Sequence, residues 1–452
     1  MADAAAPLNI PRAGLRSPAL KLVLIVVLTV LMAVPLLFIQ IALDEREGRA
    51  AEAAVDIASG WGGAQTVAGP MLFVPYEVPR TDVVNGVTTQ TIDRQTAVVL
   101  PNRLDMDAAA DTDTRWRGIF AVPVYRSAIK MRAGFDRATI TGLHIEGARI
   151  LWDQAYVAVA VSDVRGLVGN VVLQLNGHPV VFRPGIPNSG GGGIHAPIDL
   201  SKLEGGLEIN AAMSLRGSRE LSLAPLGEQT TAHIASKWPD PSFSGAFLPS
   251  ERQISNKGFD ARWAVPYLAR GFGQTLNSTD QLQTVYGSTF GVRFYQSVDF
   301  YQLVQRSLKY AGLFVGLAFL IFFIVELVAG TRLHAAQYAM IGAAQVLFYL
   351  LLLSFAEHIG FTKAYGLAMA GTVTMTCLYA SSVLGSRLRA AILFVILSAL
   401  YALLYVILIQ EDYAMLVGSL LIFGALGVTM FVTRRMDWYR VIPAPGSVGG
   451  TV

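Results

Sequence analysis

The stretch Leu22–Leu43 reads LVLIVVLTVLMAVPLLFIQIAL and decides the fold class, because nothing in it suits a soluble domain. A bilayer core is spanned by about 20 mostly apolar residues in a helix. Signal-peptide cores are shorter, about 7–15 residues, and end at a small-residue cleavage site. This run ends instead in DEREGR. We therefore expect an uncleaved membrane span at 22–43, in which Pro35 is tolerated.

Composition and the later sequence extend this expectation to a protein with several spans. Of the 452 residues, 53% are hydrophobic and only 15% are charged, which is typical of membrane proteins. Apolar runs return densely in the C-terminal part, a predicted bundle at 306–433. Its five spans are predicted at 310–328, 337–356, 363–383, 390–409 and 413–432. The region 44–305 contains no spanning run, so the sequence predicts about six spans around one large inserted domain.

Basic residues flanking the short loops predict the orientation. If the N-terminus is cytoplasmic, the short outside turns carry only one Lys or Arg, which is Lys363. The inside segments then carry Arg12, Arg16, Lys21, Arg332, Arg387, Arg389, Arg434, Arg435 and Arg440. The sequence thus predicts cytoplasmic tails at 1–21 and 434–452. The region 44–305 then lies outside the membrane, which in a bacterium means the periplasm.

Alternating apolar residues predict that the inserted domain is mainly β, after an Ala- and Glu-rich helical start that continues the first span. Strands are expected in YVAVAVSDV (156–164), VVLQLNGHPVVF (171–182) and LEINAAMSL (207–215). Asn176-Gly177 is a strong hairpin signal. The fold class is therefore a multi-pass helical membrane protein with a periplasmic antiparallel sandwich, or two small β units. PGIPNSGGGG (184–193) is expected to be a mobile loop.

Charge excludes one class of partner for this domain. Residues 44–305 contain 23 Lys/Arg and 26 Asp/Glu, a balance of 23 − 26 = −3, and form no basic stripe. Nucleic acid is therefore not expected as a partner. The lipid bilayer and an unknown component or protein outside the membrane are expected as partners; the sequence does not indicate the oligomeric state.

The segment WPDPSFSGAFLP (238–249) combines three prolines with several aromatic residues. Proline argues against a central strand here. One interpretation is an extended strip that covers the sandwich with its aromatic rings. The other is a partner-binding strip that uses Trp238, Phe243 and Phe247.

No motif for catalysis, a metal or a cofactor is present. Cys377 is the only cysteine, and the six histidines form no close metal-binding pair. A nucleophile elbow and a Walker A loop are also missing. We expect a protein that is not an enzyme, although a catalytic set scattered in sequence stays open.

Two polar groups in the membrane part are candidate sites. Near the inner ends of spans two and three, Glu326, Arg332, His334 and Gln337 form either an ion-paired hairpin or a polar site that couples the helices or carries a proton. The centres of the spans contain no charged residue, which argues against an ion-driven pump.

The outer turns carry Glu357, His358, Glu411 and Asp412. The alternatives for Glu357 and His358 are a hydrated helix end, a proton relay or half of a metal site. We also expect these turns to form a polar rim where the bundle meets its own outside domain.

Several long motifs resemble those of one family. They include GPMLFVPY (69–76), RWRGIFAVPVYRSAIKMRAGF (115–135), SDVRGL (162–167), FYLLLLSFAEHIGF (348–361) and LYVILIQEDYAMLVGSLLIFGALGVTMFVTRRMDWY (404–439). In these motifs the chain closely resembles the CreD family of bacterial inner-membrane proteins, from about Ile41 to Tyr439. The resemblance implies a role in cell envelope integrity and stress response, with links to colicin tolerance and β-lactam response. It supplies no catalytic residue or ligand.

Three functions remain after these observations. The first is a non-enzymatic envelope protein whose β domain binds a component or partner. The second is a transporter or lipid-handling protein that works through the five-span bundle. The third is an envelope hydrolase, which requires a cluster of Asp, Ser or His in one cleft of the β domain.

Overall fold

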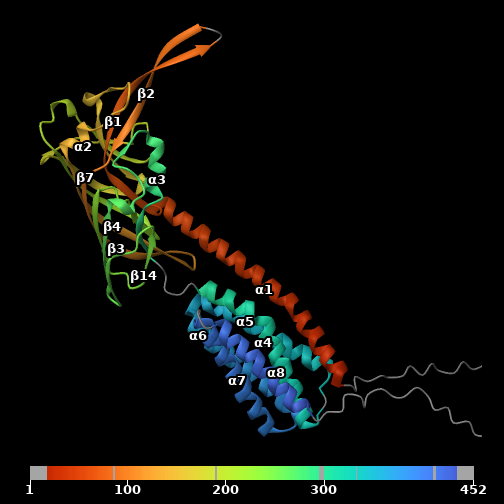
Figure 1. Ribbon diagram of the computed structural model, residues 1–452. Helices are drawn as coiled ribbons and strands as arrows, with labels where there is room; N and C mark the ends of the chain where they lie inside the picture. Colours follow the sequence, from red (N-terminus) through yellow and green to blue (C-terminus); the bar gives the residue numbers. More distant parts are fainter. Residues whose placement is uncertain are drawn as a thin grey trace, which may run out of the picture. The chain divides into compact units, whose positions relative to one another are not determined.

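The computed structural model describes residues 18–84, 87–188, 191–294, 300–331, 333–410 and 414–434. The chain forms two compact units. One consists of Met1–Gly48 with Val298–Val452, and its described residues are mainly helical; the other is Arg49–Ser297, and its described residues are mainly in strands. The predicted fold class is confirmed: a β-rich domain is inserted between the first helix and five later ones (Figure 1).

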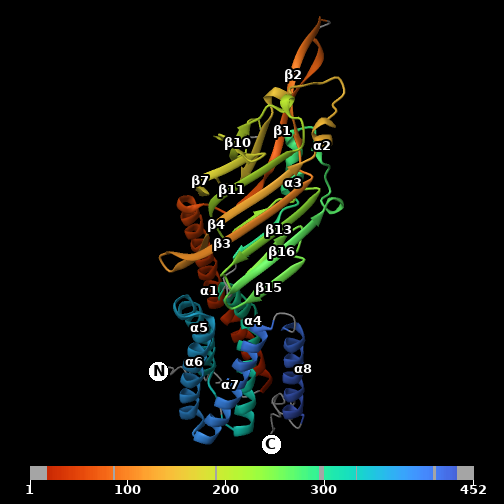
Figure 2. The ribbon, with the colours of Figure 1, turned by 90° about the vertical axis from the view of Figure 1, so that its left-hand side faces the viewer.

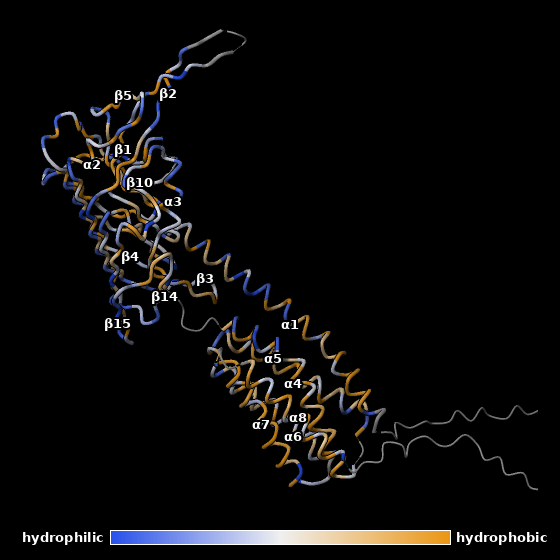
Figure 3. Tube along the Cα trace, viewed as in Figure 1, coloured by the Kyte–Doolittle hydropathy of each residue, from blue (hydrophilic) through white to orange (hydrophobic). Residues whose placement is uncertain are grey.

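Six helices of the described residues are long and apolar enough to cross a membrane. They are α1 (Pro18–Trp61), α4 (Phe300–Ala329), α5 (Ala335–Ile359), α6 (Phe361–Leu384), α7 (Arg387–Ile409) and α8 (Ala414–Thr433). Apolar residues dominate α4 to α8 and the first half of α1 (Figure 3). In the bundle, α5 packs between α4 and α6, and α6 packs on α7.

Two helices extend beyond the apolar runs that predict them. The predicted helical continuation of the first span is confirmed, because α1 runs on to Trp61. The start of α4 is not predicted, because the sequence predicts a span at 310–328 and α4 begins at Phe300. The extra turns of α4 are amphipathic, with Tyr301, Val304 and Ser307 buried. Such a face keeps a helix packed after its hydrocarbon run ends. The domain border at residue 305 therefore falls inside α4.

The inserted domain contains a ten-stranded and an eight-stranded sheet. The ten-stranded sheet runs in the order β14 (Pro241–Gly245), β18 (Phe290–Phe294), β12 (Glu220–Leu223), β1 (Gln65–Val84), β6 (Tyr156–Val161), β10 (Gly193–Pro197) and β9 (Arg183–Pro184). Three more strands join it around β1: β2 (Val87–Val99), β17 (Thr275–Leu276) and β5 (Arg149–Ile150). The far ends of β1 and β2 project beyond the rest of the sheet (Figure 1).

The strands of the eight-stranded sheet lie side by side in Figure 2. Their order is β15 (Glu251–Ser255), β16 (Gly258–Pro266), β13 (Gln229–Ser236), β3 (Arg103–Arg117), β4 (Phe120–Phe135), β11 (Leu207–Ser218), β7 (Leu167–Leu175) and β8 (His178–Pro179). Two short helices, α2 (Arg137–Thr141) and α3 (Leu282–Tyr286), complete the unit.

Aromatic side chains from both sheets form a shared core. The ring of Trp263 on β16 lies 5.3 Å from that of Phe290 on β18 and 5.8 Å from that of Phe243 on β14. Tyr125 on β4 similarly contacts Phe294, with ring centroids 4.9 Å apart. These contacts and the single hydrophobic cluster around them define a two-layer sandwich.

The hairpin at Asn176-Gly177 is confirmed. These residues have φ angles of 47° and 81°, as a tight hairpin turn requires, and they join β7 to β8 with Leu175 opposite His178. The sandwich is not purely antiparallel, because β1 pairs with β12 and β3 pairs with β13 in parallel. Both parallel pairs join strands that are distant in sequence, where no hairpin sets the direction.

Neither irregular segment forms a central strand, as the sequence predicts. In the 184–193 segment, only the ends join strands: β9 at the sheet edge and β10 beside it. Its predicted mobility stays a prediction, and residues 189 and 190 lie outside the described residues. In the 238–249 segment, β14 is an edge strand that pairs with β18, and Pro241 is its first residue.

Candidate functional site

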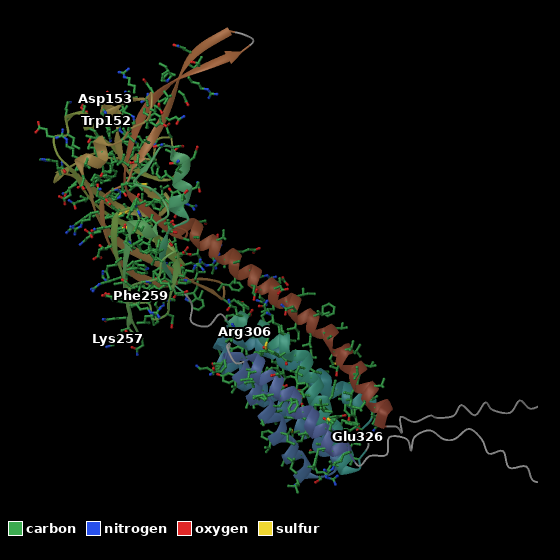
Figure 4. All side chains as sticks on the ribbon, in the orientation of Figure 1. Trp152, Asp153, Lys257, Phe259, Arg306 and Glu326 are labelled. Carbon is green, nitrogen blue, oxygen red and sulfur yellow. The ribbon has the colours of Figure 1, made fainter. Side chains whose placement is uncertain are left out.

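A buried carboxylate at one end of the bundle binds groups from three segments. Glu326 lies near the C-terminus of α4 (Figure 4). Its side chain is 4% exposed. It forms an ion pair with Lys21 of α1 and accepts hydrogen bonds from the Tyr338 hydroxyl of α5 at 2.9 Å and the Leu333 N–H at 3.2 Å. We call this group of residues the Glu326 cluster.

The Glu326 cluster is chemically complete. A buried charge is tolerated when it is paired and its remaining lone pairs accept hydrogen bonds. Lys21 supplies the charge, and Tyr338 and Leu333 supply two further donors. The arrangement therefore suits a structural junction between α1, α4 and α5 better than a carboxylate awaiting a proton.

The other residues of the predicted inner site have a different task. The His334 Nδ1 accepts a hydrogen bond from the Ala336 N–H at 3.2 Å, and the Gln337 side chain accepts one from the His334 N–H at 2.8 Å. This reciprocal pattern is a capping box at the start of α5. Neither side chain hydrogen-bonds Glu326 in the part of the chain that the structure describes, and Arg332 lies outside that part.

Glu357 forms a second junction at the opposite end of α5. Its side chain is 6% exposed; it lies 3.6 Å from the Arg46 guanidinium of α1 and accepts a hydrogen bond from the Tyr301 hydroxyl of α4 at 3.3 Å. We call these three residues the Glu357 cluster. The adjacent His358 is exposed, and its ring Nδ1 lies 3.0 Å from the Ser354 carbonyl oxygen of its own helix.

The predicted outer rim is therefore only partly described. The contacts of His358 resemble those of a hydrated helix end, and it shares no partner with Glu357 among the described residues. Glu411 and Asp412 lie outside the described residues. The predicted role of these turns as a rim stays a prediction.

Together the two clusters hold α1 against α4 and α5 at both ends of the bundle. The α1 segment between Lys21 and Arg46 is about 37 Å long at 1.5 Å per residue. A hydrocarbon core is about 30 Å thick, so the two ion pairs bracket a membrane-spanning length of helix.

A polar group near the middle of the bundle consists of uncharged residues, so the pattern of intramembrane charges does not predict it. The Tyr401 hydroxyl of α7 donates to the Gln345 Oε1 of α5 at 2.6 Å, and the Tyr365 hydroxyl of α6 donates to the Tyr401 carbonyl at 2.7 Å. Gln345 is 3% exposed, and its Nε2 has no partner among the described residues. We call these three residues the mid-span cluster.

In the β domain, the last residue of α1 is held by two arginines. The guanidinium carbons of Arg115 and Arg216 lie 4.6 Å and 4.7 Å from the Trp61 ring centroid, a cation–π arrangement. The Trp61 Nε1–H donates to the Tyr125 carbonyl at 3.3 Å. We call these four residues the Trp61 joint.

The residues that follow Trp61 are anchored just as firmly. The buried Gln65 amide donates to the carbonyls of Asp163 at 3.0 Å and Arg216 at 2.8 Å. The Asp163 carboxylate accepts from Arg165 at 2.8 Å and from the Gly63 N–H at 3.0 Å, and these bonds lower its pKa to about 2. Hydrogen bonds of Gln65, Gly63 and Asp163 thus fix the chain directly after α1.

The aromatic rings of the 238–249 segment pack inward. Phe243 contacts Phe259 and Trp263 with ring centroids 5.8 Å away, and Trp238 meets Phe294 at 6.5 Å. Phe247 meets Phe290 at 6.4 Å. These contacts favour the cover strip, while partner binding through the three half-buried rings stays a prediction.

Among the described residues, no group of three or more His, Cys, Asp or Glu is arranged to hold a metal ion. The residues that the sequence did not reveal are mainly the hydrogen-bond and ion-pair partners within the clusters. Lys21 lies 305 positions from Glu326, and Gln345 and Tyr401 are uncharged. The signal for Lys21 was its predicted place at the same membrane face as Glu326.

Two comparisons with known proteins agree with each other. Residues 17–439 match the model of the family described as "Inner membrane protein CreD". The chain is 31% identical over 420 residues to the Inner membrane protein CreD of Escherichia coli (strain K12), an alignment that covers 90% of this chain and 91% of that protein.

Proposed function

Because the chain belongs to the CreD family of inner membrane proteins, we propose that it supports the cell envelope by binding an envelope component or protein through its β domain. The helix α1 transmits the bound state to the helical bundle. In this proposal the protein is not an enzyme, and the bundle is the receiver of the signal rather than a simple anchor.

The observation that carries the proposal is the continuity of α1. One helix of 44 residues contributes Lys21 and Arg46 to the two bundle clusters and Trp61 to the joint in the sandwich. A simple anchor needs about 20 residues and no fixed ends. In this proposal, a change in the β domain that shifts Trp61 also shifts Arg46 and Lys21, because one hydrogen-bonded helix contains all three residues.

We further propose that both termini are cytoplasmic and the β domain is periplasmic. Support comes from the end of the bundle that carries the Glu326 cluster. Arg389 at the start of α7 donates to the Ala329 carbonyl there, so Lys21 and Arg389 lie at one end. Basic residues concentrate at the cytoplasmic face of membrane proteins.

Complementation tests where the function resides. A strain that lacks the chain is tested for envelope leakage with either the full chain or residues 1–299, which keep α1 and the β domain. We expect rescue by the full chain alone, at equal abundance of both proteins. Rescue by residues 1–299 would show that the function does not need the bundle. It would overturn the proposal that α1 relays the bound state to the bundle.

The mid-span cluster favours a second candidate, a transporter or lipid-handling protein that works through the bundle. The Gln345 amide is buried near the middle of the bundle, and its Nε2 has no partner in the described part of the chain. Such a group is costly in a membrane and often functional. Replacing Gln345 with Leu removes that group. Loss of rescue by an inserted, correctly folded Gln345→Leu protein would support this candidate; normal rescue would remove it.

A further inference from the structure

A groove runs along the surface of the bundle between α6 and α7. Its volume is about 520 Å³. The α7 wall runs from Arg387, the first residue of that helix, to Val395, a length of about 12 Å at 1.5 Å per residue. The described residues that line it are Thr374, Cys377, Leu378, Ser381, Arg387, Ala390, Ala391, Phe394 and Val395.

The walls of the groove are shaped for a flexible apolar chain. Its floor contains small side chains, of which Cys377 and Ala390 are 7% and 8% exposed. Its sides are Leu378, Phe394 and Val395, whose side chains stay 66%, 45% and 65% exposed. Small residues below and large apolar residues beside them leave a slot into which hydrocarbon fits.

One end of the groove carries a positive charge. Arg387 is the single charged residue among those that line it, and its side chain is exposed. The start of α7 lies at the Glu326 end of the bundle, as the bond from Arg389 to Ala329 shows. The groove therefore leads from a guanidinium at the membrane surface into an apolar slot at hydrocarbon depth.

We propose that this groove binds one anionic phospholipid. The phosphate pairs with Arg387, and an acyl chain lies along Cys377, Ala391 and Phe394. Basic residues beside grooves between membrane helices are the chemistry that recognises anionic headgroups. The proposal goes beyond the relay function and does not depend on it, since lipid is bound whether or not α1 transmits a signal.

A helix is a poorer occupant than a lipid. The neighbouring α8 contacts α4 and α7, and most of its described residues are exposed. A packed helix needs a long, two-sided interface, whereas this slot is about two turns deep. It also carries a charge that an apolar helix from a second copy would leave unpaired.

Lipid retention tests the proposal directly on the full-length protein. The chain is purified and returned to nanodiscs of phosphatidylglycerol or phosphatidylcholine with identical acyl chains. Native mass spectrometry then counts the lipids that remain bound. We expect one phosphatidylglycerol to be retained, with a preference that falls about fivefold in Arg387→Gln, the effect of one basic side chain at a membrane surface.

Matched variants separate the groove from general surface charge. Arg434→Gln removes an arginine that lies over the Phe431 ring instead, and we expect it to keep the preference. Ala391→Phe fills the slot and is expected to expel the lipid, whereas Ala370→Phe makes the same change at an exposed position of α6 outside the groove and is expected to have no effect.

The only cysteine provides a second readout. Cys377 lies in the groove floor, so a bound acyl chain is expected to slow its reaction with N-ethylmaleimide in phosphatidylglycerol discs, and Arg387→Gln is expected to remove that protection. Three results would overturn the proposal: equal retention of both lipids, the same loss in Arg434→Gln, or a lipid-free dimer whose Cys377 is protected.

Discussion

At the residue scale, the two shielded carboxylates of the bundle, Glu326 and Glu357, each have a basic partner on α1. Both carboxylates are shielded from solvent, but their basic partners differ in exposure. The Lys21 side chain is 15% exposed, and the Arg46 side chain is 42% exposed. Ion pairs weaken as solvent reaches them. The two junctions of α1 therefore contribute unequally to stability.

Glu326→Gln should be the more damaging change. It leaves Lys21 without a counter-charge in a shielded site, and breaking a buried pair costs about 3–5 kcal/mol. Arg46→Gln should cost less than about 1 kcal/mol because water already reaches Arg46. Thermal unfolding of the full-length protein in detergent measures both.

The double variant Lys21→Met with Glu326→Gln provides the control for that prediction. With both charges removed, the protein should recover part of the stability that Glu326→Gln loses. A double variant that is as unstable as the sum of the two single variants would show that the ion pair is not the cause.

The lowered pKa of Asp163 should make the stability of the β domain depend on pH. Its pKa is about 2 in the folded protein, against an ordinary 3.8, mainly because of the hydrogen bonds from Arg165. A lowered pKa stabilises the fold above about pH 4, and this contribution is lost as pH falls toward 2. Asp163→Asn should cost about 1–3 kcal/mol at pH 7, and the difference from wild type should shrink as pH falls below 4.

Tryptophan fluorescence can measure the unfolding of the β domain. That unit contains five tryptophans: Trp61, Trp116, Trp152, Trp238 and Trp263. An unchanged difference between the variants from pH 6 to pH 3 would contradict the role given to the carboxylate.

At the element scale, close helix packing explains why α1 stays with α5 between its two ends. A Cβ added to Gly342 of α5 would lie 2.6 Å from the Phe319 Cζ of α4 and 3.1 Å from the Met32 Cγ of α1. Membrane helices use small residues for such close approaches. Gly342 is thus the contact point of three helices.

Gly342→Val should therefore separate these helices and lower stability by about 1–3 kcal/mol, the usual cost of overpacking. Gly366→Val on α6 is the matched control, because nothing lies within 4 Å of a Cβ at that position. Thermal unfolding of both variants decides the matter. Equal stability of the two would mean that the α1–α5 contact is looser than described.

Elements that depend on local sequence could be predicted, and elements that depend on distant partners could not. The Asn176-Gly177 turn and the run Leu22–Leu43 carry their own signals. The parallel pairs β1–β12 and β3–β13 carry none, since strand direction there depends on where the chain returns.

The same limit applies to the candidate sites. Glu326 stands out as an acid in an apolar run, but its partner Lys21 lies at the other end of the chain and Tyr338 looks like an ordinary core aromatic residue. Gln345 has no charge, so a search for intramembrane charges passes over it, although its amide is buried and unpaired among the described residues.

At the scale of the whole molecule, two units share one helix. The part of α1 up to Gly48 belongs to the helical unit, and the part from Arg49 to Trp61 belongs to the unit that contains the sandwich. The central claim is that its backbone carries the state of the β domain to the bundle. A break in α1 between Arg46 and Trp61 should therefore abolish function while leaving each unit folded.

Ala51→Pro tests that claim most directly. Ala51 is exposed on α1 outside both bundle clusters, and an interior proline breaks or kinks a helix at a cost of about 3 kcal/mol. Ala51→Ser is the matched control. Envelope leakage is measured in a strain that lacks the chain, with each variant inserted at wild-type abundance and with wild-type tryptophan fluorescence. We predict rescue by Ala51→Ser and none by Ala51→Pro; full rescue by Ala51→Pro would contradict transmission through α1.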